Sequence, residues 1–438
     1  MTYQDRQESS REKQRRQKLK LCLPDGNPET MSDPHLPVEL LDHIVDLLYD
    51  TEDALMNCCL VSKSWAPRTR KHLFANVKVR SAHHLKSWRE TFPDPSTSPA
   101  RYAKTLSVSC PRAVTAADAE SGGWITGFCS VVHLEVIDHK PSMMATDEPT
   151  ISFAPFHGFS PIIKSLRVAF FIIPSSQVFD FILSFPLLED LAVVAYRGSS
   201  ESVRDSDGSD GLSAMVQPSN PPAFTGSLDL FMRQGMKSVA YRLLSLQSGI
   251  HFQKLTLRWF REEDLLLTTA LVEGCASTLK SLDIVHDPSC TSSHTCVCAR
   301  GSLLFLGKTR TITIDLSKAT KLRDVVFRSG SSNVEWITVT LQTIAPAHQD
   351  LRRITIHASN GFSCFSPDFV QIPAEEIRGQ WPDLDRVLVR LWESHSIRPR
   401  VVHAILEGQG REWCMRMKDC IKSSLSEIGR EIIDLVDD

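Results

Sequence analysis

The most regular feature of the chain is a triplet of apolar residues at positions i, i+3 and i+5, which recurs between about residues 100 and 395. The last two members fit a short strand with one face turned inward, and the first fits the turn that enters the strand. Central residues of successive triplets lie 25 to 43 positions apart. The triplets are Ala103/Leu106/Val108, Val131/Leu134/Val136, Ile163/Leu166/Val168, Leu188/Leu191/Val193, Leu228/Leu230 without a clear first member, Phe252/Leu255/Leu257, Leu279/Leu282/Ile284, Leu322/Val325/Phe327, Leu351/Ile354/Ile356 and Leu384/Val387/Val389.

Helical patterns lie between several of these predicted strands. Apolar stripes at i, i+3, i+4 and i+7 are Val178/Phe181/Ile182/Phe185 and, with one threonine, Val334/Ile337/Thr338/Leu341. Residues 262–273 open with three acidic side chains, as a helix N-terminus favours, and reach a glycine stop. A repeated strand–helix unit predicts an α/β solenoid, right-handed as parallel crossovers are, whose units bury their faces against one another.

Residues 36–80 have a different pattern, typical of three short helices. The first begins at Pro37 and carries the apolar stripe Leu40, Leu41, Ile44, Leu47 and Leu48; the others fit residues 53–61 and 65–74. A unit of this size cannot bury all of its apolar surface internally. The uncovered part either binds another protein or packs against the solenoid as a cap, and we favour the interface.

The motifs in this segment resemble an F-box: LPxELLxxIxxLL at 36–48, CCLVSKSW at 58–65 and RKHLF at 70–74. The resemblance implies three helices that dock on a Skp-type adaptor, which bridges to a cullin ubiquitin ligase. Carried over by position, the adaptor-binding residues are Leu36, Pro37, Leu40, Ile44, Leu48, Leu60, Val61 and Trp65. The stretches ARYAKTLSV, FTGSLDL and STLKSLDI are similar to the irregular leucine-rich repeats of F-box proteins from mushroom-forming (basidiomycete) fungi.

These patterns predict an order of domains along the chain. Residues 1–33 form a disordered tail, 34–80 the F-box, 81–99 a linker helix, 100–395 the leucine-rich-repeat-like solenoid with a mobile insertion at 198–222, and 396–438 a C-terminal cap whose residues 411–436 form one amphipathic helix. The resemblance assigns target binding to the solenoid. Charged residues between strand anchors are the candidate target-binding residues: Arg167, His286, Arg323, Arg353 and Arg390.

Composition narrows the class of protein further. The 438 residues carry 49 Lys+Arg against 52 Asp+Glu, a balance that argues against a nucleic-acid binder. No apolar run reaches the length of a membrane span, and the N-terminal residues lack the apolar stretch of a secretory signal. The 12 cysteines are then expected to be reduced thiols in a cytoplasmic or nuclear protein. The basic cluster at 11–18 fits a nuclear address, although a solvated tail explains it as well.

Candidate chemistry is sparse. No phosphate-binding, dinucleotide-binding, zinc-protease or serine-hydrolase motif is present, so we expect no catalytic residue and no cofactor. Cys290, His294, Cys296 and Cys298 supply zinc-ligand chemistry, but two ligands only two apart strain a tetrahedral site, and a thiol-containing loop is favoured. The expected function is a substrate-recognition subunit of an SCF-type cullin ubiquitin ligase. The alternatives are an F-box-containing scaffold outside ubiquitin chemistry and an enzyme built on repeats.

Overall fold

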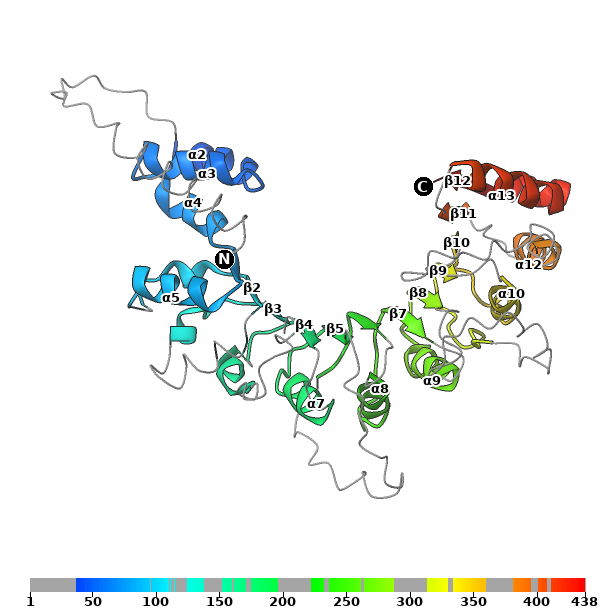
Figure 1. Cartoon of the computed structure of the whole chain (residues 1–438), viewed down its shortest axis with the longest axis horizontal. Coiled ribbons are helices and arrows are strands. Elements are labelled where there is room, and N and C mark those ends of the chain that lie inside the picture. The colour runs from blue at the N-terminus through cyan, green and yellow to red at the C-terminus, as the bar shows by residue number, and fades with distance from the viewer. Residues whose placement is uncertain are drawn as a thin grey trace. The chain divides into compact units, whose positions relative to one another are not determined.

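The computed structural model divides after Thr69 into two compact units (Figure 1). It describes residues 37–94, 96–109, 111, 114, 124–137, 152–159, 161–170, 175–195, 222–231, 236–260, 264–286, 313–329, 334–359, 381–394, 401–407 and 411–437. The expected tail at 1–33, nearly all of the insertion at 198–222 and the cysteine cluster at 290–298 lie outside these residues.

The first unit contains short helices, as the sequence predicts. They are α2 (Val38–Leu47), α3 (Glu52–Val61) and the start of α4 (Ala66–Leu73). Pro37 precedes α2 with an extended backbone, where its fixed φ and missing N–H cost nothing. Glu52 and Asp53 occupy the first turn of α3, where their negative charges interact favourably with the positive end of the helix dipole.

The second unit is built on one sheet of twelve parallel strands, ordered in space as they are along the chain. The strands are β1 (Asn76–Val79), β2 (Thr105–Val108), β3 (His133–Ile137), β4 (Ser165–Phe170), β5 (Asp190–Ala195), β6 (Ser227–Phe231), β7 (Lys254–Phe260), β8 (Ser281–His286), β9 (Asp324–Ser329), β10 (Arg353–Ser359), β11 (Val401–Glu407) and β12 (Ile433–Asp437). Each pairs only with its sequence neighbours, which is the pattern of a leucine-rich-repeat-like solenoid.

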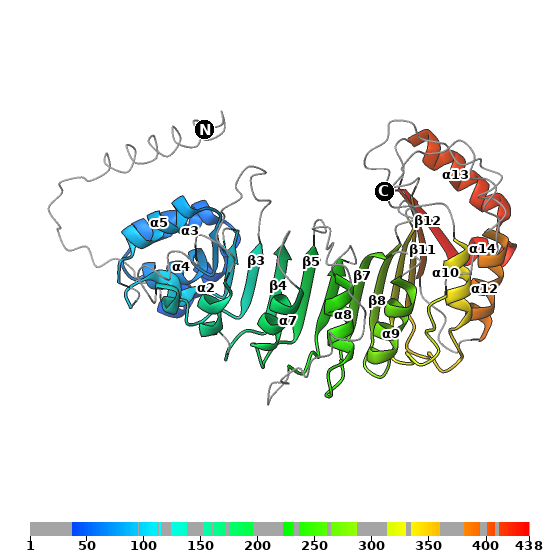
Figure 2. The ribbon, with the colours of Figure 1, turned by 60° about the horizontal axis from the view of Figure 1, so that its bottom comes forward.

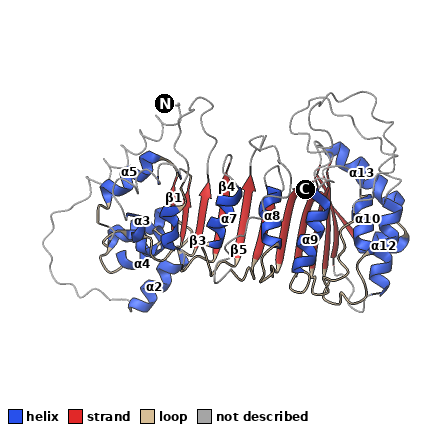
Figure 3. Ribbon diagram, turned by 90° about the horizontal axis from the view of Figure 1, so that it is seen from below, coloured by secondary structure: helices blue, strands red, loops and turns tan. Residues whose placement is uncertain are grey.

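The helices of the second unit pack on one side of this sheet, and the other side carries no helix among the described residues of that unit (Figures 1, 2 and 3). They are α5 (Ala82–Thr91), α7 (Ser175–Leu183), α8 (Met236–Leu244), α9 (Leu265–Cys275), α10 (Glu335–Gln342), α12 (Trp381–Ser394), α13 (Arg411–Ser424) and α14 (Glu427–Ile432). Short 3-10 helices at Pro99–Tyr102, Trp124–Gly127 and Ala154–Phe159 connect the first strands. The fold class expected from the sequence, α/β with a strand–helix solenoid after short helices, is confirmed.

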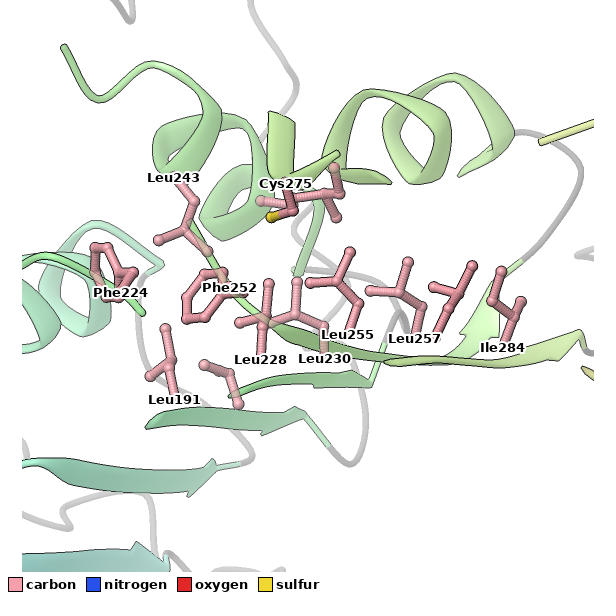
Figure 4. Close-up of a cluster of buried hydrophobic side chains, with 14 of the residues drawn as sticks. Leu191, Phe224, Leu228, Leu230, Leu243, Phe252, Leu255, Leu257, Cys275 and Ile284 are labelled. Carbon is pink, nitrogen blue, oxygen red and sulfur yellow. The ribbon is translucent and has the colours of Figure 1, made fainter. Parts of the chain in front are cut away.

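The apolar triplets form the core as predicted. Leu255 and Leu257 of β7 lie in register with Leu282 and Ile284 of β8, and all four are fully buried. Figure 4 shows Leu255, Leu257 and Ile284 on one side of the strands, the side that faces Leu243 and Cys275 of the helix layer. Because residues two apart share one face of a strand, the repeated pair aligns from strand to strand into a continuous apolar row.

The missing triplet member before β6 is Phe224, which stands four residues before Leu228 instead of three. It is fully buried, and its ring centroid lies 5.2 Å from that of Phe252, the equivalent residue of the next repeat. Its φ of 45° accommodates the additional residue in the turn. For a bulky aromatic residue this backbone conformation is unfavourable, so burial of the ring must offset the cost.

The predicted helices lie close to their expected positions. Val178, Phe181, Ile182 and Phe185 are all buried in or just after α7, and the stripe of α10 is buried as well. Helix α9 begins at Leu265 rather than at 262, and Gly274 lies inside it. A Cβ atom at 274 would lie 3.1 Å from a side-chain carbon of Ile250, so this glycine permits close packing between neighbouring repeats.

The sheet extends beyond both ends expected for it. Strand β1 precedes the predicted linker helix, α5, which crosses from β1 to β2, so that both belong to the repeats. Leu85 of α5 is buried, and Trp88 stacks on Phe128 with ring centroids 5.7 Å apart. Apolar residues Val77 and Val79 of β1 are buried, although no triplet was assigned there.

At the C-terminal end the single helix predicted over 411–436 is instead α13, α14 and strand β12, and β11 precedes them. The strand predicted at Leu384/Val387/Val389 is wrong, because residues 381–394 form α12. Leu384, Leu388 and Leu391 are buried at helical spacing there. Among the described residues, no helix combines the length and hydrophobicity needed to cross a lipid bilayer.

Candidate protein-interaction surfaces

The first unit exposes an unusual amount of apolar surface. Seven of the twelve large hydrophobic residues that are exposed in the described chain lie between positions 38 and 61, a stretch of only 24 residues. We call these seven the apolar face: Val38, Leu40, Ile44, Leu47, Tyr49, Leu60 and Val61. Leu40, Ile44 and Leu47 share one side of α2, because they are spaced at i, i+4 and i+7. Exposed apolar side chains grouped in this way typically mark a protein-binding site.

A small set of residues holds the first unit together beneath this face. Val45 of α2 and Leu55 of α3 each retain only 1% exposure, and Cys58 is also buried. Arg68 of α4 pairs with Asp46 of α2, where its Nε donates a hydrogen bond of 2.7 Å to Oδ1. That interaction raises the pKa of the Arg68 guanidinium. The planar guanidinium donates hydrogen bonds to both oxygens of the Asp46 carboxylate, which fixes orientation as well as distance. This pair therefore holds α4 in a defined position against α2.

The structure leaves most of the predicted adaptor-binding residues accessible. Pro37, Leu40, Ile44, Leu60 and Val61 are exposed. In the same set, Leu48 and Trp65 are partly buried, and Leu36 lies outside the described residues. The sequence analysis did not assign this role to Val38, Leu47 and Tyr49. Leu47 shares one side of α2 with Leu40 and Ile44, whereas Val38 lies on the opposite side and Tyr49 follows the end of the helix.

The strand face without helices carries a ladder of ion pairs. In each pair an acidic residue on one strand meets an arginine on the next strand. The pairs are Glu135–Arg167 (3.3 Å), Asp229–Arg258 (3.1 Å), Asp283–Arg328 (3.3 Å) and Asp324–Arg353 (3.8 Å). Cross-strand pairs of opposite charge help to fix the register of neighbouring strands.

Asp229 is an acid of this ladder whose titration is shifted by burial. Burial raises the pKa of its carboxyl group, and the nearby Arg258 and Arg167 oppose that shift. Its Oδ2 accepts a hydrogen bond of 3.1 Å from Arg258. The paired charges on this face therefore compensate one another within the chain, and the ladder presents alternating charges without a strong net charge.

The five predicted target-binding residues do not share one surface. Arg167 and Arg353 lie on the open strand face, in the ion pairs described above. Arg323 is exposed immediately before β9, and His286 ends β8, with its side chain outside the described residues. Arg390 lies on α12, in the helix layer, so its placement between two strand anchors was wrong. Its selection rested on the strand predicted at 384–389, which the structure replaces with α12.

Thiol and metal chemistry adds little to these surfaces. Among the described residues, no group of three or more His, Cys, Asp or Glu side chains is arranged to hold a metal ion. Cys275, the last residue of α9, is buried in the core between the helix layer and the sheet, and its burial raises the pKa of the thiol to about 12. A thiol with such a pKa carries almost no thiolate at neutral pH and is unsuited to nucleophilic chemistry.

No protein-family model matches the chain, and no curated protein gives a significant match to it. The chemistry of the apolar face and the motifs that form it therefore carry the functional assignment.

Proposed function

We propose that the chain is the substrate-recognition subunit of an SCF-type cullin ubiquitin ligase. The first unit acts as an F-box that docks a Skp-type adaptor through the apolar face, and the repeats hold the target protein. The chain contributes no catalytic residue of its own. It raises the effective concentration of the target at the ligase, so that ubiquitin transfer becomes in effect intramolecular.

The observation that carries this proposal is the exposure of the apolar face. Complete burial of a leucine or isoleucine side chain contributes about 1.5–3 kcal/mol. At the exposures seen here, from 40% for Ile44 to 72% for Val61, each residue still has about 0.6–2 kcal/mol to gain from a partner. The seven residues together could gain about 6–13 kcal/mol, which is comparable with an association cost of about 4–15 kcal/mol. The F-box motifs coincide in sequence with this face, which is why a Skp-type adaptor is the proposed partner.

The test is affinity purification of the wild-type chain beside a double variant, Pro37→Ala with Ile44→Asp. Both positions are exposed, so the substitutions change the surface while Val45 and Leu55 keep the unit folded. We expect adaptor and cullin to disappear together from the variant while target proteins remain. Leu266→Asp is the matched control, because Leu266 is 83% exposed in the second unit and should leave the adaptor bound.

The outcomes separate this proposal from its alternatives. Recovery of the adaptor without a cullin by the wild-type chain would favour a scaffold outside ubiquitin chemistry. Identical partners for the wild-type chain and the double variant would show that the apolar face does not bind the adaptor.

A further inference from the structure

The C-terminal end of the sheet has a basic pocket of about 510 Å³ that the proposed function does not use. Lys418 and Lys422 contribute to it from one face of α13, because they are four residues apart. Arg430 contributes from α14, and among the described residues Asp434 is the one acid that lines it. The lining thus carries three positive side chains and one negative side chain, an arrangement that favours an anionic ligand.

The same pocket reaches the edge of the sheet. Besides the charged residues it is lined by Leu425 and Ile433. Consecutive residues of a strand point to opposite faces, so a pocket that touches both Ile433 and Asp434 of β12 extends around the outer edge of that strand. Strand β12 is the last of the sheet, and no described strand pairs with this outer edge.

The basic side chains have a defined position relative to that edge. Ile433 lies in register with Val402 of β11 and is 6% exposed, so its side chain belongs to the face that the helices cover. Nε of Arg430 donates a hydrogen bond of 3.3 Å to the carbonyl oxygen of Leu425, which anchors the guanidinium beside the end of α13. The cations therefore lie on the helix side of the edge.

From these two features we infer that the outer edge of β12 binds an extended acidic peptide segment of a partner protein. The segment adds to the sheet as a further strand through main-chain hydrogen bonds. Carboxylates at every second position point toward Lys422 and Arg430, since alternate side chains share one face. Uncharged residues at the intervening positions avoid Asp434 on the opposite face. This surface lies entirely in the second unit and is independent of the apolar face.

The test uses the full chain and a labelled nine-residue peptide of alternating Glu and Thr, measured by fluorescence polarisation. We expect binding that weakens as salt is raised. We also expect the double variant Lys422→Glu with Arg430→Glu to lower affinity at least tenfold, and Lys422→Gln with Arg430→Gln to lower it by a smaller factor. The matched control is Lys321→Glu with Arg352→Glu, an equal change of charge at two exposed positions elsewhere in the repeats.

Strand addition has a second readout that simple charge attraction lacks. Bound peptide should slow amide hydrogen exchange in residues 433–437, and a peptide of the same composition with its glutamates in one block should bind more weakly. Equal loss of affinity in the control variant, equal binding of the block peptide, or no binding to the wild-type chain would overturn the inference. Adaptor capture by the Lys422→Glu, Arg430→Glu variant should be unchanged, which separates this result from the proposed function.

Discussion

Two leucines on the same helix give a sharp comparison between core and interface. Leu55 and Leu60 both belong to α3, but Leu55 is 1% exposed and Leu60 is 67% exposed. If the apolar face is reserved for a partner, truncating Leu60 to alanine removes few contacts within the chain, whereas truncating Leu55 opens a cavity. The substitution is chemically identical at the two positions, so the difference reports packing alone.

The magnitudes follow from these exposures. Leu55→Ala should cost about 2–5 kcal/mol, the range for a leucine in a packed core. Leu60 buries only about a third of its surface, so Leu60→Ala should cost about 0.5–1 kcal/mol. The higher helix propensity of alanine reduces that cost further.

The assay is amide hydrogen exchange of residues 52–61 in the full chain, which reports local opening of α3 without requiring the whole protein to unfold. Leu55→Ala should speed exchange by about 30-fold or more, and Leu60→Ala by about fivefold or less, since 1.4 kcal/mol corresponds to a factor of about ten. Comparable acceleration by the two variants would refute the reasoning, because Leu60 would then be part of the core.

Two further outcomes test the second unit. Gly429 lies against the Asp385 carboxylate, so Gly429→Ala forces α14 away from α12 and should lower the free energy of unfolding in urea by about 1–3 kcal/mol. Gly158→Ala is the control and should be nearly neutral, because no atom lies within 4 Å of the added carbon. Equal losses of stability in the two variants would contradict the packing at Gly429. With a pKa of about 12, Cys275 should resist alkylation at pH 8 until the chain unfolds, whereas exposed Cys129 should react at once; equal rates in the native protein would exclude the buried position.

The repeats were predictable because their signal combines two periods. A pair of buried residues two apart indicates a strand, and a third residue at fixed distance locates the turn, as at Phe252, Leu255 and Leu257. The same pattern failed at 384–389, since residues i and i+3 also share a helix face and Leu384 satisfies both periods. Strand β12 was missed for the converse reason: Ile433, which the structure places in a strand, follows directly on a helical stripe.

The apolar face was predictable in kind but not in detail. Apolar residues occur on nearly every side of α2, from Val38 through Leu48, so periodicity alone does not select the buried ones. Tertiary packing buries Val45 and leaves Ile44 and Leu47 exposed. The pairing of Arg68 with Asp46, across 22 residues of sequence, likewise depends on how the helices meet and has no local signature.

The most direct test of the central proposal is calorimetric titration of the purified full chain with a purified Skp-type adaptor. The account predicts tight binding by the wild-type chain and at least a hundredfold loss of affinity in the double variant Ile44→Asp with Leu60→Asp, because charges would then enter a dry interface. Leu266→Asp in the second unit should bind as the wild type does. No binding by the wild-type chain, or the same affinity in the double variant, would contradict the proposal that the apolar face docks the adaptor.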